Sequence, residues 1–144
     1  MTTLVWRGAK EWDAAMQRLV TRAGQSCRRG ANNAARLVAS ETKKTLTTTT
    51  HKKGTPTPSR PGEPPSLVTG TLRRGVIIVP AVPQGSTAYV AKVGPTSVYA
   101  RVQELGGDTG TTVLPARPYL QPTVERLVGS GALWAAFASG WEQF

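Results

Sequence analysis

The feature that most constrains this chain is a stripe of apolar and small residues across its first third. These residues recur at steps of three and four, which is the spacing of one helix face and not the alternation of a strand. Lysines and arginines occupy many of the positions between them. We therefore expect a long amphipathic helix over residues 9–46, with a narrow apolar seam and a basic outer face. The stripe consists of Trp12, Met16, Leu19, Ala23, Cys27, Ala31, Ala34, Val38, Thr42 and Leu46.

Two glycines weaken the middle of this helix, and a run of threonines should end it. Gly24 and Gly30 each weaken it by about 1 kcal/mol relative to alanine, so they allow a bend or break near residues 24–32. Four consecutive threonines at 47–50 should end it, because β-branched side chains lose rotamer freedom in a helix. A seam this narrow gains little by packing on one small domain, so we expect the helix to lie against something else.

A proline-rich basic segment, residues 47–66, follows the helix. Its part from 51 to 66 has five prolines and two glycines in sixteen positions. Proline removes backbone donors and favours extended geometry in the residue before it, which predicts a loop or extended arm. Long loops in small domains are either functional or disordered, so an arm that grips a partner and a mobile linker both remain open.

The second half of the chain changes to strand-like patterns. Residues 75–82 contain a Val-Ile-Ile-Val run, residues 87–94 alternate, and Pro-Gln-Gly at 83–85 lies between them. This pattern predicts a β-hairpin. A short helix over 97–105, stopped by Gly106 and Gly107, should follow.

After a glycine-rich loop, we expect a short strand at 112–114 and two terminal helices. Pro118 or Pro122 can open the first of these helices, which should reach about Val128. Ser130 can cap the last helix, in which Trp134 and Trp141 concentrate aromatic area that usually docks. The predicted class is α+β in one domain, with a β-rich body over 67–128 and a Trp-rich C-terminal helix over 129–144.

The charge is unevenly distributed. Eighteen Lys and Arg against eight Asp and Glu give the chain a net charge of +10, and all of it lies in residues 1–74, which hold 14 basic and 4 acidic residues. Phosphates and acidic protein surfaces would suit these cations equally well. No helix-turn-helix spacing, zinc pattern or aromatic ladder points to base reading. The candidates for an interface or for DNA contact are Arg28, Arg29, Arg36, Lys43, Lys44, Lys52, Lys53, Arg60, Arg73, Arg74 and Arg117.

Catalytic and metal chemistry have little support. One cysteine, Cys27, and one histidine, His51, cannot form an internal disulfide or a Cys/His ligand cluster. No apolar run approaches the roughly 20 residues of a membrane span. Glu104 and Asp108 could hold magnesium as in a nuclease, which we keep only as a weak alternative. We expect no enzyme activity, no catalytic residues, no cofactor and no metal.

Glu104 also lies near the end of the expected helix over 97–105, where the helix dipole disfavours an acid. We therefore expect a compensating cation, with Arg101 or Arg117 as the candidate.

Three short stretches, in a fixed order, resemble a known family. They are Thr69–Gly75 (TGTLRRG), Tyr99–Gly107 (YARVQELGG) and Pro115–Thr123 (PARPYLQPT). Together they are similar to the tail-completion, or head–tail joining, proteins of long-tailed bacteriophages. The resemblance covers roughly residues 66–128. Its motif positions are Thr69, Gly70, Leu72, Tyr99, Ala100, Glu104, Gly106, Arg117, Pro118, Tyr119, Leu120 and Pro122.

The resemblance implies a structural virion protein that forms a ring, commonly a hexamer, at the head–tail junction. Its partners would be its own copies and the adjoining neck and tail proteins, with non-specific contact to passing DNA as one option. The chain would be made in the host cytoplasm and would end in the virion. A tail terminator and a non-specific DNA-binding protein remain the alternatives.

Two departures from the family pattern are mild. Gly75 stands where the family often has serine, and Leu105 stands where an aromatic residue is common. Without the family, we expect Leu72, Val102 and Leu120 to pack inside the chain. For Arg73, Arg74 and Arg117, internal packing and an interface role both stay open.

Overall fold

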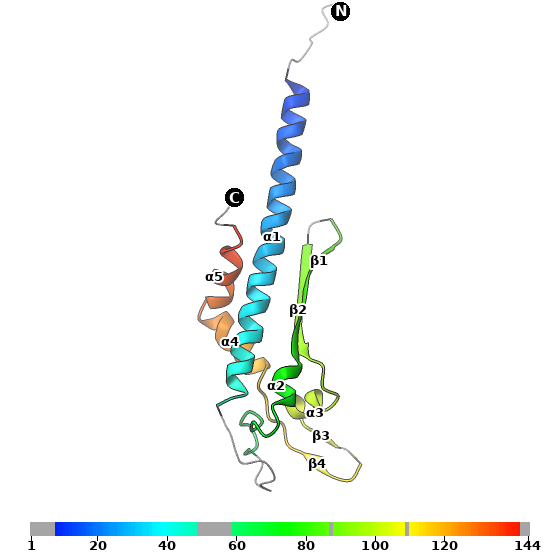
Figure 1. The fold of residues 1–144 in the computed structure, drawn as a ribbon, viewed down its shortest axis with the longest axis vertical. Helices are drawn as coiled ribbons and strands as arrows, with labels where there is room; N and C mark the ends of the chain where they lie inside the picture. Colours follow the sequence, from blue (N-terminus) through cyan, green and yellow to red (C-terminus); the bar gives the residue numbers. More distant parts are fainter. Residues whose placement is uncertain (1–7, 49–58, 87, 109, 142–144) are drawn as a thin grey trace, which may run out of the picture.

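The computed structural model describes residues 8–48, 59–86, 88–108 and 110–141. It has the expected α+β class, with a long N-terminal helix, a small antiparallel sheet and short C-terminal helices (Figure 1). In chain order the elements are α1 (Ala9–Thr45), α2 (Thr71–Gly75), β1 (Val76–Gln84), β2 (Ala88–Pro95), α3 (Ala100–Leu105), β3 (Gly107–Asp108), β4 (Val113–Leu114), α4 (Gln121–Gly129) and α5 (Ala132–Ala138).

Helix α1 is the axis of the molecule. The β1–β2 hairpin lies along one side of it, and α4 and α5 lie along the other (Figure 1). The helix is continuous from Ala9 to Thr45, so it has no break near residues 24–32. Its two glycines instead allow close approach of other elements. A Cβ on Gly24 would lie 3.1 Å from the Tyr89 hydroxyl, and a Cβ on Gly30 would lie 2.5 Å from the Phe137 carbonyl oxygen.

The hairpin packs one face on α1. Its register runs from Val76 opposite Pro95 to Gln84 opposite Ala88, with an irregularity between Val79 and Val82. Within this irregularity the backbone N–H of Ala81 donates to the side-chain oxygen of Asn32 on α1, at 2.8 Å. Asn32 therefore supplies the acceptor that the irregular strand does not, and it fixes the hairpin to the helix.

Helices α2 and α3 and strands β3 and β4 gather at the C-terminal end of α1, whereas α5 lies beside its middle (Figure 1). Strands β3 and β4 form a second antiparallel pair, with Gly107 opposite Leu114. Of these two strands, the sequence analysis predicted only β4. Helix α5 starts after Gly131, whose φ of 73° is left-handed, and no side chain caps it at that residue. The N-cap residue is thus Gly131, one position after the predicted Ser130, and Ser130 Oγ still accepts the backbone N–H of Ala132, the first residue of α5, at 3.5 Å.

The core lies at this end too. It joins the C-terminal part of α1 to residues of α2, β1 and α3 and to the residues before α4, so it could form only from long-range contacts. Partly buried side chains of Ile78, Val93 and Leu120 pack around it. The fully packed cluster contains Ala39, Leu46, Leu72, Val76, Ala100 and Tyr119.

Candidate functional site

The three stretches that carry the family resemblance meet in this core. Leu72 of α2, Ala100 of α3 and Tyr119 before α4 belong to the same buried cluster. Each comes from a different stretch, separated by at least nineteen residues in the sequence. The motif residues are thus structural neighbours, and their side chains hold three chain segments together.

Glu104 is the main polar link between two of these stretches. Its Oε2 accepts the backbone N–H groups of Tyr119 at 2.9 Å and Leu120 at 3.0 Å, and its Oε1 accepts that of Gln121 at 2.8 Å. These are free N–H groups at the start of α4, where a negative charge is favoured. The predicted cation is therefore not the partner of Glu104: backbone donors from another helix compensate its charge.

The side chain of Tyr119, whose backbone N–H binds this carboxylate, lies in the core. Burial raises the pKa of Tyr119 to about 12, and the charges of Glu104 and Tyr99 add to the shift. A phenol with this pKa stays protonated at neutral pH. Tyr119 therefore packs in the core as a neutral phenol at neutral pH.

The magnesium alternative finds no constellation in the described part of the chain. No group of three or more His, Cys, Asp or Glu residues there could hold a metal ion. Glu104 is engaged by three backbone donors. Asp108 Oδ1 accepts the N–H of Gly110 at 2.7 Å, which is a local turn contact.

Arg117 differs from the other basic candidates because it is buried, with only 8% of the residue exposed. Its Nε donates to the backbone oxygen of Ser59 at 3.0 Å, and its backbone N–H donates to the oxygen of Gln103 at 2.7 Å. The neighbouring Ala116 oxygen accepts the N–H of Gly62. Arg117 thus ties the described end of the proline-rich segment to the body, and its side chain does not face solvent.

The remaining motif positions serve the backbone or lie at the surface. Gly70 and Gly106 have left-handed φ angles of 72°, and a Cβ on Gly106 would lie 2.8 Å from the Ala116 nitrogen. Pro122 lies in the first turn of α4, as expected for a helix start. Thr69, Tyr99 and Pro122 are exposed, and Pro118 and Leu120 are half-buried.

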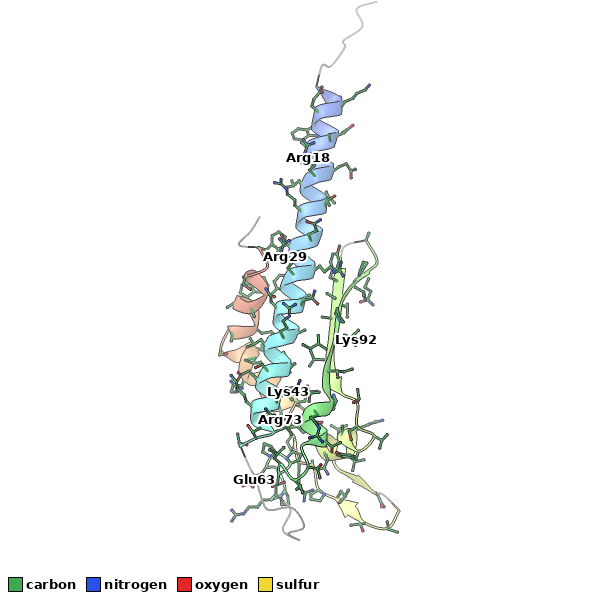
Figure 2. All side chains as sticks on the ribbon, in the orientation of Figure 1. Arg18, Arg29, Lys43, Glu63, Arg73 and Lys92 are labelled. Carbon is green, nitrogen blue, oxygen red and sulfur yellow. The ribbon has the colours of Figure 1, made fainter. Side chains whose placement is uncertain are left out.

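Of the basic candidates outside α1, Arg60, Arg73 and Arg74 are exposed. Arg74 Nη1 donates to the backbone oxygen of Thr69 at 3.0 Å, which orients it against the turn before α2. Lys52 and Lys53 lie outside the described residues. Figure 2 shows Arg73 near the same end of the molecule as Lys43.

The basic candidates on α1 divide into free and engaged side chains. Arg28 is exposed and Lys43 is half-buried. Arg29 donates to Gly140 and to Ser26, and Arg36 donates to Asn33. Lys44 pairs with Glu41 at 2.6 Å, and that carboxylate also pairs with Arg126 of α4 at 2.9 Å.

The first turns of α1 project beyond the rest of the chain (Figure 1). Between Ala9 and Arg22 every residue is exposed except the half-buried Met16. The exposed set includes the apolar Trp12, Leu19 and Val20. The predicted seam is thus covered only in its C-terminal part, while its N-terminal part has no cover from the described residues.

Sequence reasoning missed the contact that seats the C-terminal region on α1. A Cβ on Gly140 would collide with the backbone of Gly30 and lie 2.9 Å from the Ser26 oxygen. Asn33 Nδ2 also donates to Ser139 Oγ at 2.9 Å. Two glycines 110 residues apart in the sequence carry no periodic signal that could have paired them.

No helix among the described residues is long and apolar enough to cross a membrane. Comparison of the chain with protein-family models, with curated proteins and with solved structures finds no match. Its function is therefore argued from the sequence and the structure alone.

Proposed function

We propose that the chain is a structural virion protein of a tailed bacteriophage that forms a ring at the head–tail junction. One observation carries the proposal: the three resembling stretches form one packed unit. Leu72, Ala100 and Tyr119 belong to one buried cluster. Glu104, in the second stretch, accepts a hydrogen bond from the backbone N–H of Tyr119 in the third stretch. A shared structural role explains why three short patterns would occur together in one order.

The surface supports assembly as the mechanism. The projecting part of α1 exposes Trp12, Leu19 and Val20, and the hairpin and α5 expose further large apolar side chains. Exposed apolar area of this kind marks surfaces that bind other proteins. In the proposal, the core region builds the ring body, and α1 and residues 51–66 reach to neighbours or to the adjoining ring. Residues 51–58 of that segment lie outside the described part.

The proposal is tested by electron microscopy of a lysate of phage whose gene for this chain is disrupted. Filled heads beside finished, separate tails are expected. Overlong tails would instead indicate a tail terminator, and intact infectious particles would contradict the virion role. Complementation with a chain that lacks residues 51–65 tests the arm: joining should fail, and normal joining would contradict an arm function.

The charge of +10 and the exposed basic residues of α1 favour one second candidate, a non-specific DNA-binding protein. The same residues could contact DNA weakly in the lumen of a ring. In either case, affinity for unrelated duplexes should fall steeply between low and physiological salt, because bound counterions are released. No binding at low salt would assign the basic surface to acidic proteins.

A further inference from the structure

The outer face of the hairpin is an apolar surface without cover from the described residues. We call Ile77, Val79 and Val82 of β1 the hairpin patch; they are 47%, 45% and 55% exposed. Lys92 lies opposite Val79 in the ladder and is exposed beside the patch (Figure 2). A two-stranded sheet is marginal in water, and α1 covers only one face of this one.

A second apolar surface lies on α4 and α5. We call Val128 and Trp134 the α4–α5 patch; they are 59% and 72% exposed. The Trp134 ring stacks on that of Phe137, at a centroid distance of 5.5 Å, which holds the indole in place. Glu125 is exposed and lies one helical turn before Val128. Exposed, pre-oriented tryptophan is the residue type that most often dominates a binding interface.

The two patches are on opposite flanks of the molecule. Gly24 and Asn32 of α1 touch the hairpin, whereas Gly30 and Asn33 touch the end of α5. At 3.6 residues per turn, Gly24 and Asn32 fall on one side of the helix and Gly30 on nearly the opposite side. Figure 1 shows the same arrangement, with α1 between the hairpin and α5.

We propose that the hairpin patch of one copy binds the α4–α5 patch of the next copy. Lys92 beside one patch and Glu125 beside the other are of opposite charge, and Lys92 would also meet an indole face. Because the patches lie on opposite flanks, the contact is head-to-tail, and such contacts make a ring when the rotation between copies closes. The inference rests on the proposed function, since it names the subunit interface of that ring.

The test measures the self-association of purified chain by analytical ultracentrifugation and native mass spectrometry. Val79→Asp and Trp134→Glu should each weaken association by about tenfold or more. The carboxylate introduced by Val79→Asp would lie opposite Lys92 in the same strand pair, so this variant should remain folded, which circular dichroism checks. Val98→Asp is the matched control, because Val98 is 96% exposed and lies outside both patches; it should associate like the unmodified chain.

Mixing the two variants separates this interface from others. The Val79→Asp chain keeps its α4–α5 patch, and the Trp134→Glu chain keeps its hairpin patch. At a concentration at which each variant alone is a monomer, the mixture should form one-to-one pairs. If hairpins instead bind hairpins, Trp134→Glu assembles by itself and the interface proposed here is overturned.

Three further outcomes would also overturn the interface. If Leu19→Asp and Val79→Asp each abolish assembly and Trp134→Glu does not, the projecting part of α1 is the occupant of the hairpin patch. If the unmodified chain is a monomer at every soluble concentration, the contact does not form between free copies. If a ring still forms in both patch variants, this interface is wrong but the proposed ring is not. The phage lysates test the virion role separately.

Discussion

The carboxylate of Glu104 accepts the backbone N–H of Tyr119, fifteen residues further along the chain, at 2.9 Å. With the N–H groups of Leu120 and Gln121 bound as well, one side chain of α3 satisfies three donors at the start of α4. This is the role of a helix cap, performed from another helix. It makes Glu104 the polar counterpart of the packing between Ala100 and Tyr119 in the core.

Glu104→Ala should destabilise the chain strongly. Three backbone donors lose a charged acceptor, and we expect the free energy of unfolding to fall by about 2–3 kcal/mol. Arg101→Ala is the control, since Arg101 is exposed and is not the partner of Glu104; it should change stability by less than about 0.5 kcal/mol. Urea unfolding measures both. An equal effect of the two substitutions would contradict the capping role.

Gly140→Ala should loosen the C-terminal region from α1. The added Cβ would collide with the Gly30 backbone, which cannot move without displacing α1, so we expect a loss of about 1–3 kcal/mol. Gly129→Ala is the matched substitution, because a Cβ there meets nothing within 4 Å. It should stabilise the chain by about 0.4–1 kcal/mol. Thermal unfolding compares them, and a neutral Gly140→Ala would refute the close contact.

Asn32→Ala should weaken the attachment of the hairpin. The N–H of Ala81, a residue that is fully buried, loses its acceptor, which costs about 1–3 kcal/mol. Gln25→Ala on the same helix is exposed and should be nearly neutral. Hydrogen exchange at Ala81 should become faster only in the first variant. Unchanged protection there would show that the side chain of Asn32 is not the acceptor.

The ion pairs of Glu41 should make stability fall in acid. Hydrogen bonds from Lys44 and then Arg126 hold the pKa of Glu41 below its usual 4.5. A carboxylate with a lowered pKa in the folded state stabilises fully above the unfolded pKa, and this contribution is lost as the pH falls through the folded value. Glu41→Gln should therefore be less stable than the unmodified chain at neutral pH, and the difference should shrink as the pH falls through the lowered pKa of Glu41 in the folded state. A difference that is constant with pH would contradict this prediction.

Much of the fold followed from local patterns in the sequence. The stripe from Trp12 to Leu46 predicted α1 within a residue of its C-terminal end, because apolar residues at steps of three and four lie on one face of a helix. The Val-Ile-Ile-Val run and the Pro-Gln-Gly turn predicted the hairpin, because β-branched residues on either side of a turn favour two paired strands. Local patterns suffice where the residues of a single helix or strand determine that element.

The rest depended on contacts between distant segments. Gly30 was interpreted as a weak point of α1, yet it is the position at which Phe137 packs closely on the helix. The sequence could not distinguish the two roles, because a glycine looks the same in both. Because Glu104 lies near the end of its own helix, we expected a cation as its partner. Its hydrogen-bond donors are instead backbone N–H groups at the start of α4. For Arg117 the sequence left internal packing and an interface role open, and its neighbours in the fold bury it. Sequence spacing carries no information on such partners.

The proposed place of the chain is a ring at the head–tail junction. Electron microscopy of purified virions labelled with a gold-tagged antibody to this chain locates it in the particle. We expect label where head and tail meet in intact particles. Label along the tail, or particles that contain none of the chain by immunoblot, would contradict it.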